Sequence, residues 1–239
     1  MPEDQRPPEA LTLLGLGEVE LKGRMPWSSN ATFLTTVCHD GVAFDAIYKP
    51  LAGERPLWDF PSGLYLREVA AYAVSELLGW GLVSETIVRH DAPHGVGSLQ
   101  RFIPADFAEH YFTLLEHAEH HQALRRIAAF DLVINNADRK SGHCLLGEDG
   151  RVWGIDHGVA FGIGPRLRTV IWDFAGEPIP GNIIDDLLAL DPGDVRAGLA
   201  DLLDEHEIDA VLGRVAEIAQ VGHFPNPDHD RRPYPWPLV

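Results

Sequence analysis

DLVINNADRKSGH, residues 131–143, and IDHG, residues 155–158, are the stretches that decide the fold of this 239-residue chain. A Gly-Glu-Asp-Gly turn between apolar residues separates them and predicts a β-hairpin. Antiparallel folding of that hairpin places His143 beside Asp156, with Asp138 one loop away. Carboxylates and an imidazole in one place can bind a divalent cation and accept a proton from a hydroxyl. The plain alternative is that both aspartates cap loop turns, because Asp-Gly turns are common.

The flanking sequence predicts a helix before this region and strands further upstream. One helical stripe, Ala123, Ile127, Phe130 and Ile134, runs directly into the 131–143 segment. A second lies between Leu66 and Leu77, with Gly79 as its C-cap. Strands are expected within residues 31–48, around an Asp-Gly turn, and at 86–88 and 98–103. Beyond Pro180 the apolar pattern predicts helices at about 183–190, 194–204 and 207–220.

Strands therefore dominate up to about residue 103, and helices interrupted by one hairpin follow. Segregated strands and helices indicate an α+β fold, and the length corresponds to between one and two typical domains. We expect a β-rich N-lobe over residues 1–103, a mostly helical C-lobe over 104–224 and a Pro-rich tail over 225–239.

Composition argues against several classes of partner. The chain carries 36 acidic and 19 basic side chains, a formal net charge of −17, so its average surface repels nucleic acids and anionic membranes. No apolar run approaches the roughly 20 residues of a membrane span, and the acidic start lacks the layout of a signal peptide. Two cysteines, Cys38 and Cys144, indicate a reducing compartment. We expect a cytoplasmic protein with no nucleic-acid partner and no stable membrane association.

Two segments together resemble the catalytic loop and metal-binding loop of the phosphatidylinositol 3/4-kinase-like group: FDLVINNADRKSGHCLL at 130–146 and VWGIDHGVAF at 152–161. Type II phosphatidylinositol 4-kinases and HipA toxin kinases are the most similar members. Three upstream segments agree in order, IYKP at 47–50, YLRE at 65–68 and GSLQRFI at 97–103. The resemblance implies a two-lobed protein-kinase-like fold with a small β-rich N-lobe and a reduced, mostly helical C-lobe.

The resemblance also implies that residues of the N-lobe bind ATP. Lys49 would contact the α/β-phosphates from its strand and Glu68 would hold Lys49 by an ion pair; the alternatives are a surface lysine and a solvent-facing glutamate. A phosphate-covering loop, or an ordinary turn, is expected at Ser28, Ser29 and Asn30. Backbone groups that would bind adenine, or form a buried strand, are those around Gln100, Arg101, Phe102 and Ile103.

In the C-lobe the resemblance gives each polar residue a role in phosphoryl transfer. Asp138 would orient and deprotonate the acceptor hydroxyl, and Asp156 would ligate Mg²⁺. Asn136 and Arg139 would shape the loop and help at the γ-phosphate. The family has a metal-binding Asn where this chain has His143. The resemblance implies Mg²⁺, whereas imidazole suits Mn²⁺ or Zn²⁺ better. We therefore expect Mg²⁺ or Mn²⁺, with His143 either a ligand of the ion or only a hydrogen-bonding residue of the loop.

These roles predict an ATP-dependent kinase that transfers the γ-phosphate to a protein or a soluble small molecule. A lipid acceptor is disfavoured because the chain has no basic amphipathic helix. The alternative is a pseudokinase that binds nucleotide, has lost transfer through the change to His143 and regulates a partner. A third hypothesis is a metal-dependent hydrolase built on Asp138, His143, Asp156 and His157. The phosphate acceptor and the oligomeric state do not follow from the sequence.

Several other residues have plainer interpretations. Cys144 is expected to be a buried apolar residue. No spacing of a closed zinc site occurs among His110, His117, His120 and His121, which predicts a solvated helix face. Arg166 and Arg168, shortly before Trp172, could receive an acidic substrate or a phosphate, or pair with acidic helices at the surface.

Overall fold

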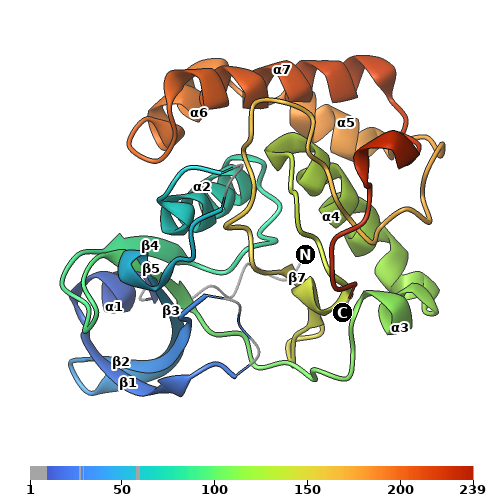
Figure 1. Ribbon diagram of the computed structural model, residues 1–239. Helices are drawn as coiled ribbons and strands as arrows, with labels where there is room; N and C mark the ends of the chain where they lie inside the picture. The colour runs from blue at the N-terminus through green and yellow to red at the C-terminus, as the bar shows by residue number, and fades with distance from the viewer. Residues whose placement is uncertain (1–9, 27, 29, 58–59, 239) are drawn as a thin grey trace. The chain divides into compact units, whose positions relative to one another are not determined.

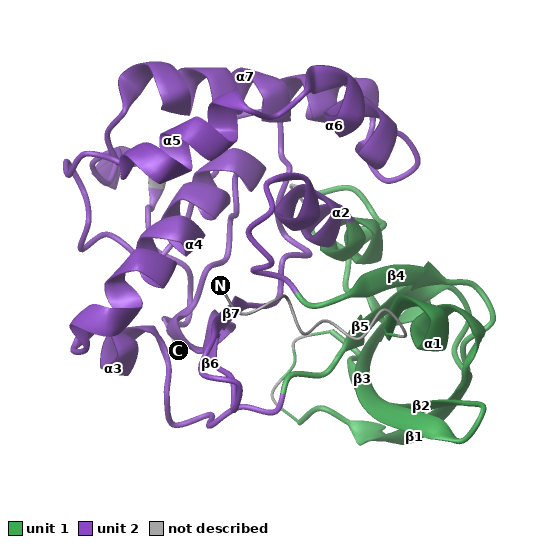
Figure 2. Ribbon diagram, turned by 180° about the vertical axis from the view of Figure 1, so that it is seen from behind, with its two compact units in different colours: residues 1–69, 84–103 green, residues 70–83, 104–239 purple. Residues whose placement is uncertain are grey.

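The computed structural model describes residues 10–26, 28, 30–57 and 60–238, which fall into two compact units. The first unit comprises residues 1–69 and 84–103, and the second comprises residues 70–83 and 104–239 (Figure 2). The chain leaves the first unit after Ile103. Residues 70–83, within the expected N-lobe, group with the second unit.

A five-stranded antiparallel sheet forms most of the first unit, in the order β1-β2-β3-β5-β4 (Figure 1). Its strands are β1 Glu18–Arg24, β2 Phe33–His39, β3 Val42–Pro50, β4 Thr86–Arg89 and β5 Gly97–Arg101. The expected Asp-Gly hairpin is confirmed, since Asp40 and Gly41 have φ of 49° and 79° between the paired residues His39 and Val42. Two consecutive positive φ angles are what a two-residue hairpin turn requires.

Helix α1, Ala10–Leu16, and strand β1 were not expected from the sequence. Leu14 of α1 belongs to the small core of this unit, with Val37, Ala46, Tyr48 and Leu99. Its carbonyl accepts a 2.6 Å hydrogen bond from Arg89 Nη1. The seven-residue helix is too short to show a helical period, and β1 alternates charged residues with only two apolar ones, as edge strands do.

The second unit is mainly helical. Its helices are α2 Leu64–Leu77 (from residue 70 on), α3 Tyr111–Leu115, α4 His121–Ile134, α5 Gly181–Leu188, α6 Pro192–Leu199 and α7 Glu205–Val221. The hairpin β6 Cys144–Leu146 and β7 Val152–Gly154 is confirmed, and short 3-10 helices are η2 Ala118–His120, η3 Ser141–His143 and η4 His229–Arg231, with η1 Leu51–Gly53 in the first unit. Ile127, Phe130 and Ile134 of the predicted α4 stripe are buried in its core. Helix α6 ends earlier than expected, after Leu199.

The tail is bonded to two segments of the second unit, the loop that precedes the hairpin and the chain around Thr169. The carbonyl of Leu238 accepts a hydrogen bond from Ser141 N at 2.9 Å, and that of Pro233 accepts one from Thr169 N at 3.0 Å. Trp236 between them is 89% exposed. Within the described ranges, no helix combines the length and the hydrophobicity that crossing a membrane requires.

Candidate active site

Lys49 of the first unit lies on β3, where it pairs with Ser98 on β5. Its Nζ forms an ion pair with Oε1 of Glu68, near the start of α2. The Glu68 side chain is only 3% exposed and that of Lys49 is 20% exposed. A carboxylate buried to this degree requires a cationic partner, so the pair fixes where the ammonium group lies. The solvent-facing alternative for Glu68 is therefore wrong, while contact of Lys49 with phosphates stays a prediction.

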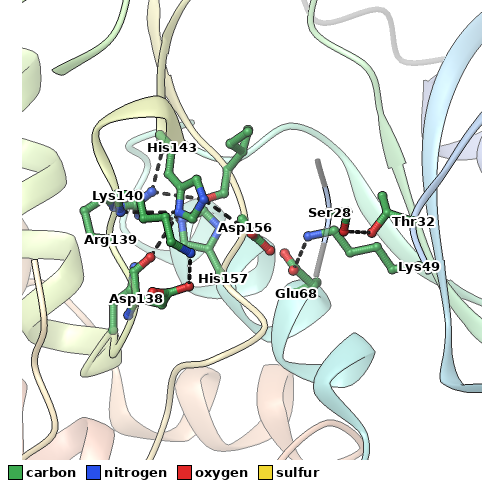
Figure 3. Close-up of polar contacts among 12 residues, drawn as sticks. Ser28, Thr32, Lys49, Glu68, Asp138, Arg139, Lys140, His143, Asp156 and His157 are labelled. Atoms are coloured by element: carbon green, nitrogen blue, oxygen red, sulfur yellow. Dashed lines mark hydrogen bonds and ion pairs between the residues drawn. The ribbon is translucent and has the colours of Figure 1, made fainter. Parts of the chain in front are cut away.

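The segment before β2 lies next to this lysine (Figure 3). Ser28 Oγ is 2.8 Å from Thr32 Oγ1, and Asn30 Oδ1 accepts a backbone N–H from the loop after β3 at 2.9 Å. Ser29 lies outside the described residues. The structure thus brings two of the three predicted loop residues to the end of the sheet that carries Lys49, and their contact with phosphate stays a prediction.

The segment expected to bind adenine is part of the sheet. Gln100 is buried and its Nε2 donates to Thr86 Oγ1 at 2.8 Å. The amide of Arg101 donates to the carbonyl of Glu85, its carbonyl accepts from Ser84 Oγ, and the amide of Phe102 donates to the carbonyl of Asp45. Three backbone groups of this segment already have partners within the unit. Gln100 is paired on both sides in the sheet, with Ile47 of β3 and Thr86 of β4, so within the described residues the carbonyl of Phe102 and the backbone of Ile103 are left for a base.

In the second unit, two asparagines shape the loop that follows α4. Asn135 ends the helix with a left-handed backbone, φ 52°, which turns the chain sharply. Asn136 is fully buried, and its Nδ2 donates to Asp131 Oδ1 at 2.9 Å. Its Oδ1 accepts the backbone N–H of Asp138 at 3.0 Å. Asn136 therefore sets the position of Asp138 relative to the helix.

Arg139 is wholly buried and bonds three parts of the second unit to one another. Its Nε and Nη2 donate to the two carboxylate oxygens of Asp131 at 2.9 and 2.8 Å. Nη1 donates to the carbonyls of His143 and Ile155, and Nη2 also donates to His157 Nε2. These contacts use all five N–H groups of a guanidinium. The expected help of Arg139 at a γ-phosphate has no donor left in this geometry, whereas the expected shaping of the loop does fit it.

Asp138 is held beside Lys140, whose Nζ donates to Asp138 Oδ2 at 2.5 Å. Burial raises the pKa of Asp138 above its usual range, and the charge of Asp156 acts in the same direction. Lys140 and Arg139 oppose that rise in pKa. The side chain of Asp138 stays 29% exposed, so the hydroxyl group of a ligand can reach it. A carboxyl with a raised pKa is better matched to accept a proton near neutral pH.

His143 and Asp156 meet across the foot of the hairpin, as the sequence predicts (Figure 3). His143 Nε2 lies 3.4 Å from Asp156 Oδ2, and His143 Nδ1 lies 3.0 Å from the carbonyl oxygen of Asp138. A backbone amide, that of Lys140, approaches Nδ1 only to 3.4 Å. Because a carbonyl oxygen can only accept, the shorter contact assigns a proton to Nδ1, and Nε2 is the ring nitrogen that faces the carboxylate.

Asp156 has a left-handed backbone, φ 59°, and a side chain that is 49% exposed. Non-glycine residues seldom adopt this conformation, and such backbone strain gathers at functional sites. His157, the next residue, is fully buried, and because arginine can only donate, its Nε2 accepts from Arg139. The hydrolase hypothesis needed His157 as a metal ligand, but His157 is buried and its Nε2 already accepts a hydrogen bond from Arg139.

The remaining candidates do not form a second site. In the described part of the chain, no group of three His, Cys, Asp or Glu side chains is arranged to hold a metal ion, so at most the pair of His143 and Asp156 could contribute protein ligands. Cys144 is fully buried, and burial raises the pKa of its thiol to about 12. Sequence reasoning missed Asp131 and Lys140, which hold Arg139 and Asp138. Lys140 stands two residues from Asp138, which is a usable signal, whereas nothing in the sequence marks Asp131 as the partner of Arg139.

A curated relative aligns with almost the whole chain. The protein Rv2133c of Mycobacterium tuberculosis is 39% identical over 273 aligned positions, which cover 94% of each protein. This chain belongs to the Rv2133c family. No family model matches the sequence.

Solved structures resemble the chain over most of its length. The proinflammatory kinase CtkA of Helicobacter pylori has a TM-score of 0.55 at 12% identity, with 92% of this chain and 96% of CtkA covered. Fam20 of hydra, solved with sugar, has a TM-score of 0.49 at 13% identity, covering 87% and 86%. HipA of Shewanella oneidensis, solved with HipB and operator DNA, has a TM-score of 0.41 at 14% identity, covering 88% and 61%. The likeness to CtkA confirms the expected α+β, kinase-like fold.

Proposed function

We propose that this chain is an ATP-dependent phosphotransferase that requires a divalent metal ion and acts on a hydroxyl group of a protein or a soluble small molecule. The observation that carries the proposal is the cluster of Asp138, His143 and Asp156, held around the buried Arg139 in a kinase-like fold. The Lys49–Glu68 ion pair supports it independently. Membership of the phosphatidylinositol 3/4-kinase-like group, in the manner of HipA, is part of the proposal.

The donor set fits a divalent cation. His143 Nε2 and Asp156 Oδ2 are 3.4 Å apart, and typical metal–nitrogen and metal–oxygen distances are about 2.0–2.2 Å, so both atoms can ligate one ion. Donation from His143 Nδ1 to a carbonyl orients the ring as it does in metal sites generally. One imidazole and one carboxylate favour Mn²⁺ over Mg²⁺. When bound, the ion neutralises charge on the phosphates.

The chain's own residues supply the remaining roles. Asp138 accepts the proton of the acceptor hydroxyl, and its raised pKa suits that task. Lys140 holds the Asp138 carboxylate in place. Lys49, fixed by Glu68, binds phosphate oxygens through its ammonium group.

The test uses the full chain with ATP and either Mn²⁺ or Mg²⁺. Nucleotide binding is measured by calorimetry, and transfer is measured as ATP turnover and autophosphorylation. Asp156→Asn should abolish metal-dependent nucleotide binding. Asp138→Asn should keep binding and lower turnover by about 10²–10⁴-fold, the usual contribution of a general base. Asp201→Asn, an exposed aspartate, is the matched control. Full turnover in Asp138→Asn would show that Asp138 is not the base.

A pseudokinase is the second candidate for two reasons. His143 stands where the phosphatidylinositol 3/4-kinase-like group has a metal-binding Asn, and Lys140 occupies one carboxylate oxygen of Asp138. The two candidates differ in the effect of His143→Asn. If this change raises transfer from a low baseline, the natural chain is a regulatory nucleotide-binding protein. If the change abolishes transfer, His143 is a working ligand. The exposed His206→Asn serves as the control.

A further inference from the structure

The second unit contains a cavity of about 550 Å³ that none of the proposed catalytic residues lines. Its walls come from the end of α4, the segment 163–172, the second half of α7 and the segment 223–233. Leu132, Leu167, Trp172 and Ile218 give it an apolar surface. A volume between about 300 and 1,000 Å³ with apolar walls and a few polar groups is typical of small-molecule sites.

Three arginines line this cavity, in a chain with a formal net charge of −17. Arg166 and Arg168 come from the 163–172 segment and Arg214 comes from α7. The carboxylates that line it, those of Glu217 and Asp228, belong to exposed residues. With three arginines against these two carboxylates, the lining has a small excess of positive charge, which favours an anionic ligand.

Arg214 carries the strongest indication of a ligand. Its Nε donates to the carbonyl of Val133 at 2.8 Å and its Nη1 to the carbonyl of Gly162 at 3.2 Å. Its Nη2 is buried and has no hydrogen-bond partner among the residues that the structure describes. Burial lowers the pKa of Arg214 to about 10. The charge of Glu207 acts against this lowering, but the hydrogen bonds of the Arg214 guanidinium go only to neutral carbonyls, so an anion in the cavity would add to the compensation of its charge.

The wall that carries Arg166 and Arg168 is bonded to the loop of Asp138. The amide of Arg168 donates to the carbonyl of Asn136 and its carbonyl accepts from the amide of Arg139, both at 3.0 Å. Asn135 Oδ1 accepts the amide of Arg166 at 3.0 Å. A ligand in the cavity would lie against the segment that supports the catalytic loop.

We infer that this cavity binds a small amphipathic anion, an apolar ring system or short acyl chain with one carboxylate, sulfonate or phosphate group. The apolar part packs against Trp172 and Ile218, and the anionic group pairs with Arg214 and Arg168. The inference does not depend on phosphoryl transfer, since the ligand takes no part in it.

The anionic probe for the cavity is 8-anilinonaphthalene-1-sulfonate. The uncharged probe is N-phenyl-1-naphthylamine, which has the same rings but lacks the sulfonate group. Fluorescence titration of the full chain should give saturable binding of the sulfonate. Arg214→Met should weaken sulfonate binding at least tenfold and change binding of the uncharged probe less than twofold. Near-UV circular dichroism checks that each variant is folded, because partly folded chains also bind the sulfonate.

Arg168→Gln gives the same test if Arg214→Met does not fold, because the backbone bonds of residue 168 are kept. It should also weaken sulfonate binding, and Ile218→Trp, which fills the cavity, should abolish binding of both probes. Arg196→Gln on the exposed face of α6 should change neither. Absence of saturable binding, or equal affinity of the natural chain and the arginine variants for the sulfonate, would overturn the inference.

Discussion

The two units each contain a cation paired with a buried carboxylate, and the two pairs are built differently. In the first unit, Lys49 keeps 20% of its side chain exposed while Glu68 is 3% exposed. In the second unit, Arg139 and Asp131 are both completely buried. The lysine is thus held by a buried anion at a place that solvent reaches, whereas the arginine is sealed within the fold.

This difference separates a group that can bind a ligand from one that supports a loop. All five N–H groups of Arg139 are used by Asp131, two carbonyls and His157. The resemblance implied a role at the γ-phosphate for Arg139, but its hydrogen bonds leave no donor for a phosphate. Exposure rather than charge makes Lys49, of the two cations, the one that solvent and solutes reach.

The largest expected effect comes from breaking the sealed pair. Arg139→Met leaves Asp131 buried and charged and removes the bonds to His143 and Ile155, so we expect a loss of about 3–5 kcal/mol in the free energy of unfolding. Urea denaturation followed by circular dichroism measures it. Arg139→Lys keeps the charge but has only three donors, and should give an intermediate loss.

The exposed Arg196–Asp209 pair is the matched control, since its two side chains are 49% and 51% exposed. Arg196→Met should cost about 0–1 kcal/mol, as surface ion pairs do. Equal losses in Arg139→Met and Arg196→Met would contradict the role of Arg139 as the support of the loop.

Breaking the Lys49–Glu68 pair of the first unit should have a smaller effect, and that effect should be on ATP binding. Lys49→Met should weaken ATP binding at least tenfold, about 1.4 kcal/mol, by calorimetry. Adding Glu68→Gln removes the buried charge that Lys49→Met leaves, so the double variant should regain stability but not ATP affinity. Lys22→Met breaks an exposed lysine–aspartate pair on the same sheet and should leave ATP affinity unchanged. Unchanged affinity in Lys49→Met would exclude Lys49 from the site.

The sequence predicted the parts of the fold that local pattern controls. The Asp40-Gly41 turn fixed the β2–β3 hairpin, and the short turn before β7 brought His143 to Asp156, because hairpin register follows from turn length. Helix α4 was evident from its apolar stripe. The kinase-like architecture followed from the order of several motifs rather than from any one of them.

What the sequence did not predict depends on burial and on distant partners. The apolar stripe of α2 left open whether Glu68 faces solvent; the resemblance implied its ion pair with Lys49, and the structure places the Glu68 side chain at 3% exposure beside that lysine. The sequence assigned no role to Asp131 and only a possible metal-ligand role to His157, yet both bond to Arg139. The cavity beside α7 assembles four segments, and no sequence pattern reports such an assembly.

The smallest expected effect is a pH dependence of stability that comes from Asp138, the residue before Arg139. Burial raises the pKa of Asp138, so the folded chain holds this proton to higher pH than the unfolded chain does. The resulting stability is fully present below the unfolded pKa, near 3.9, and is lost as the pH rises through the raised value. The melting temperature of the natural chain should therefore fall relative to that of Asp138→Asn as the pH increases from about 4 to 7. A relative rise over this range would mean that attraction by Lys140 and Arg139 outweighs burial, and Asp138 would then be a poorer base than proposed.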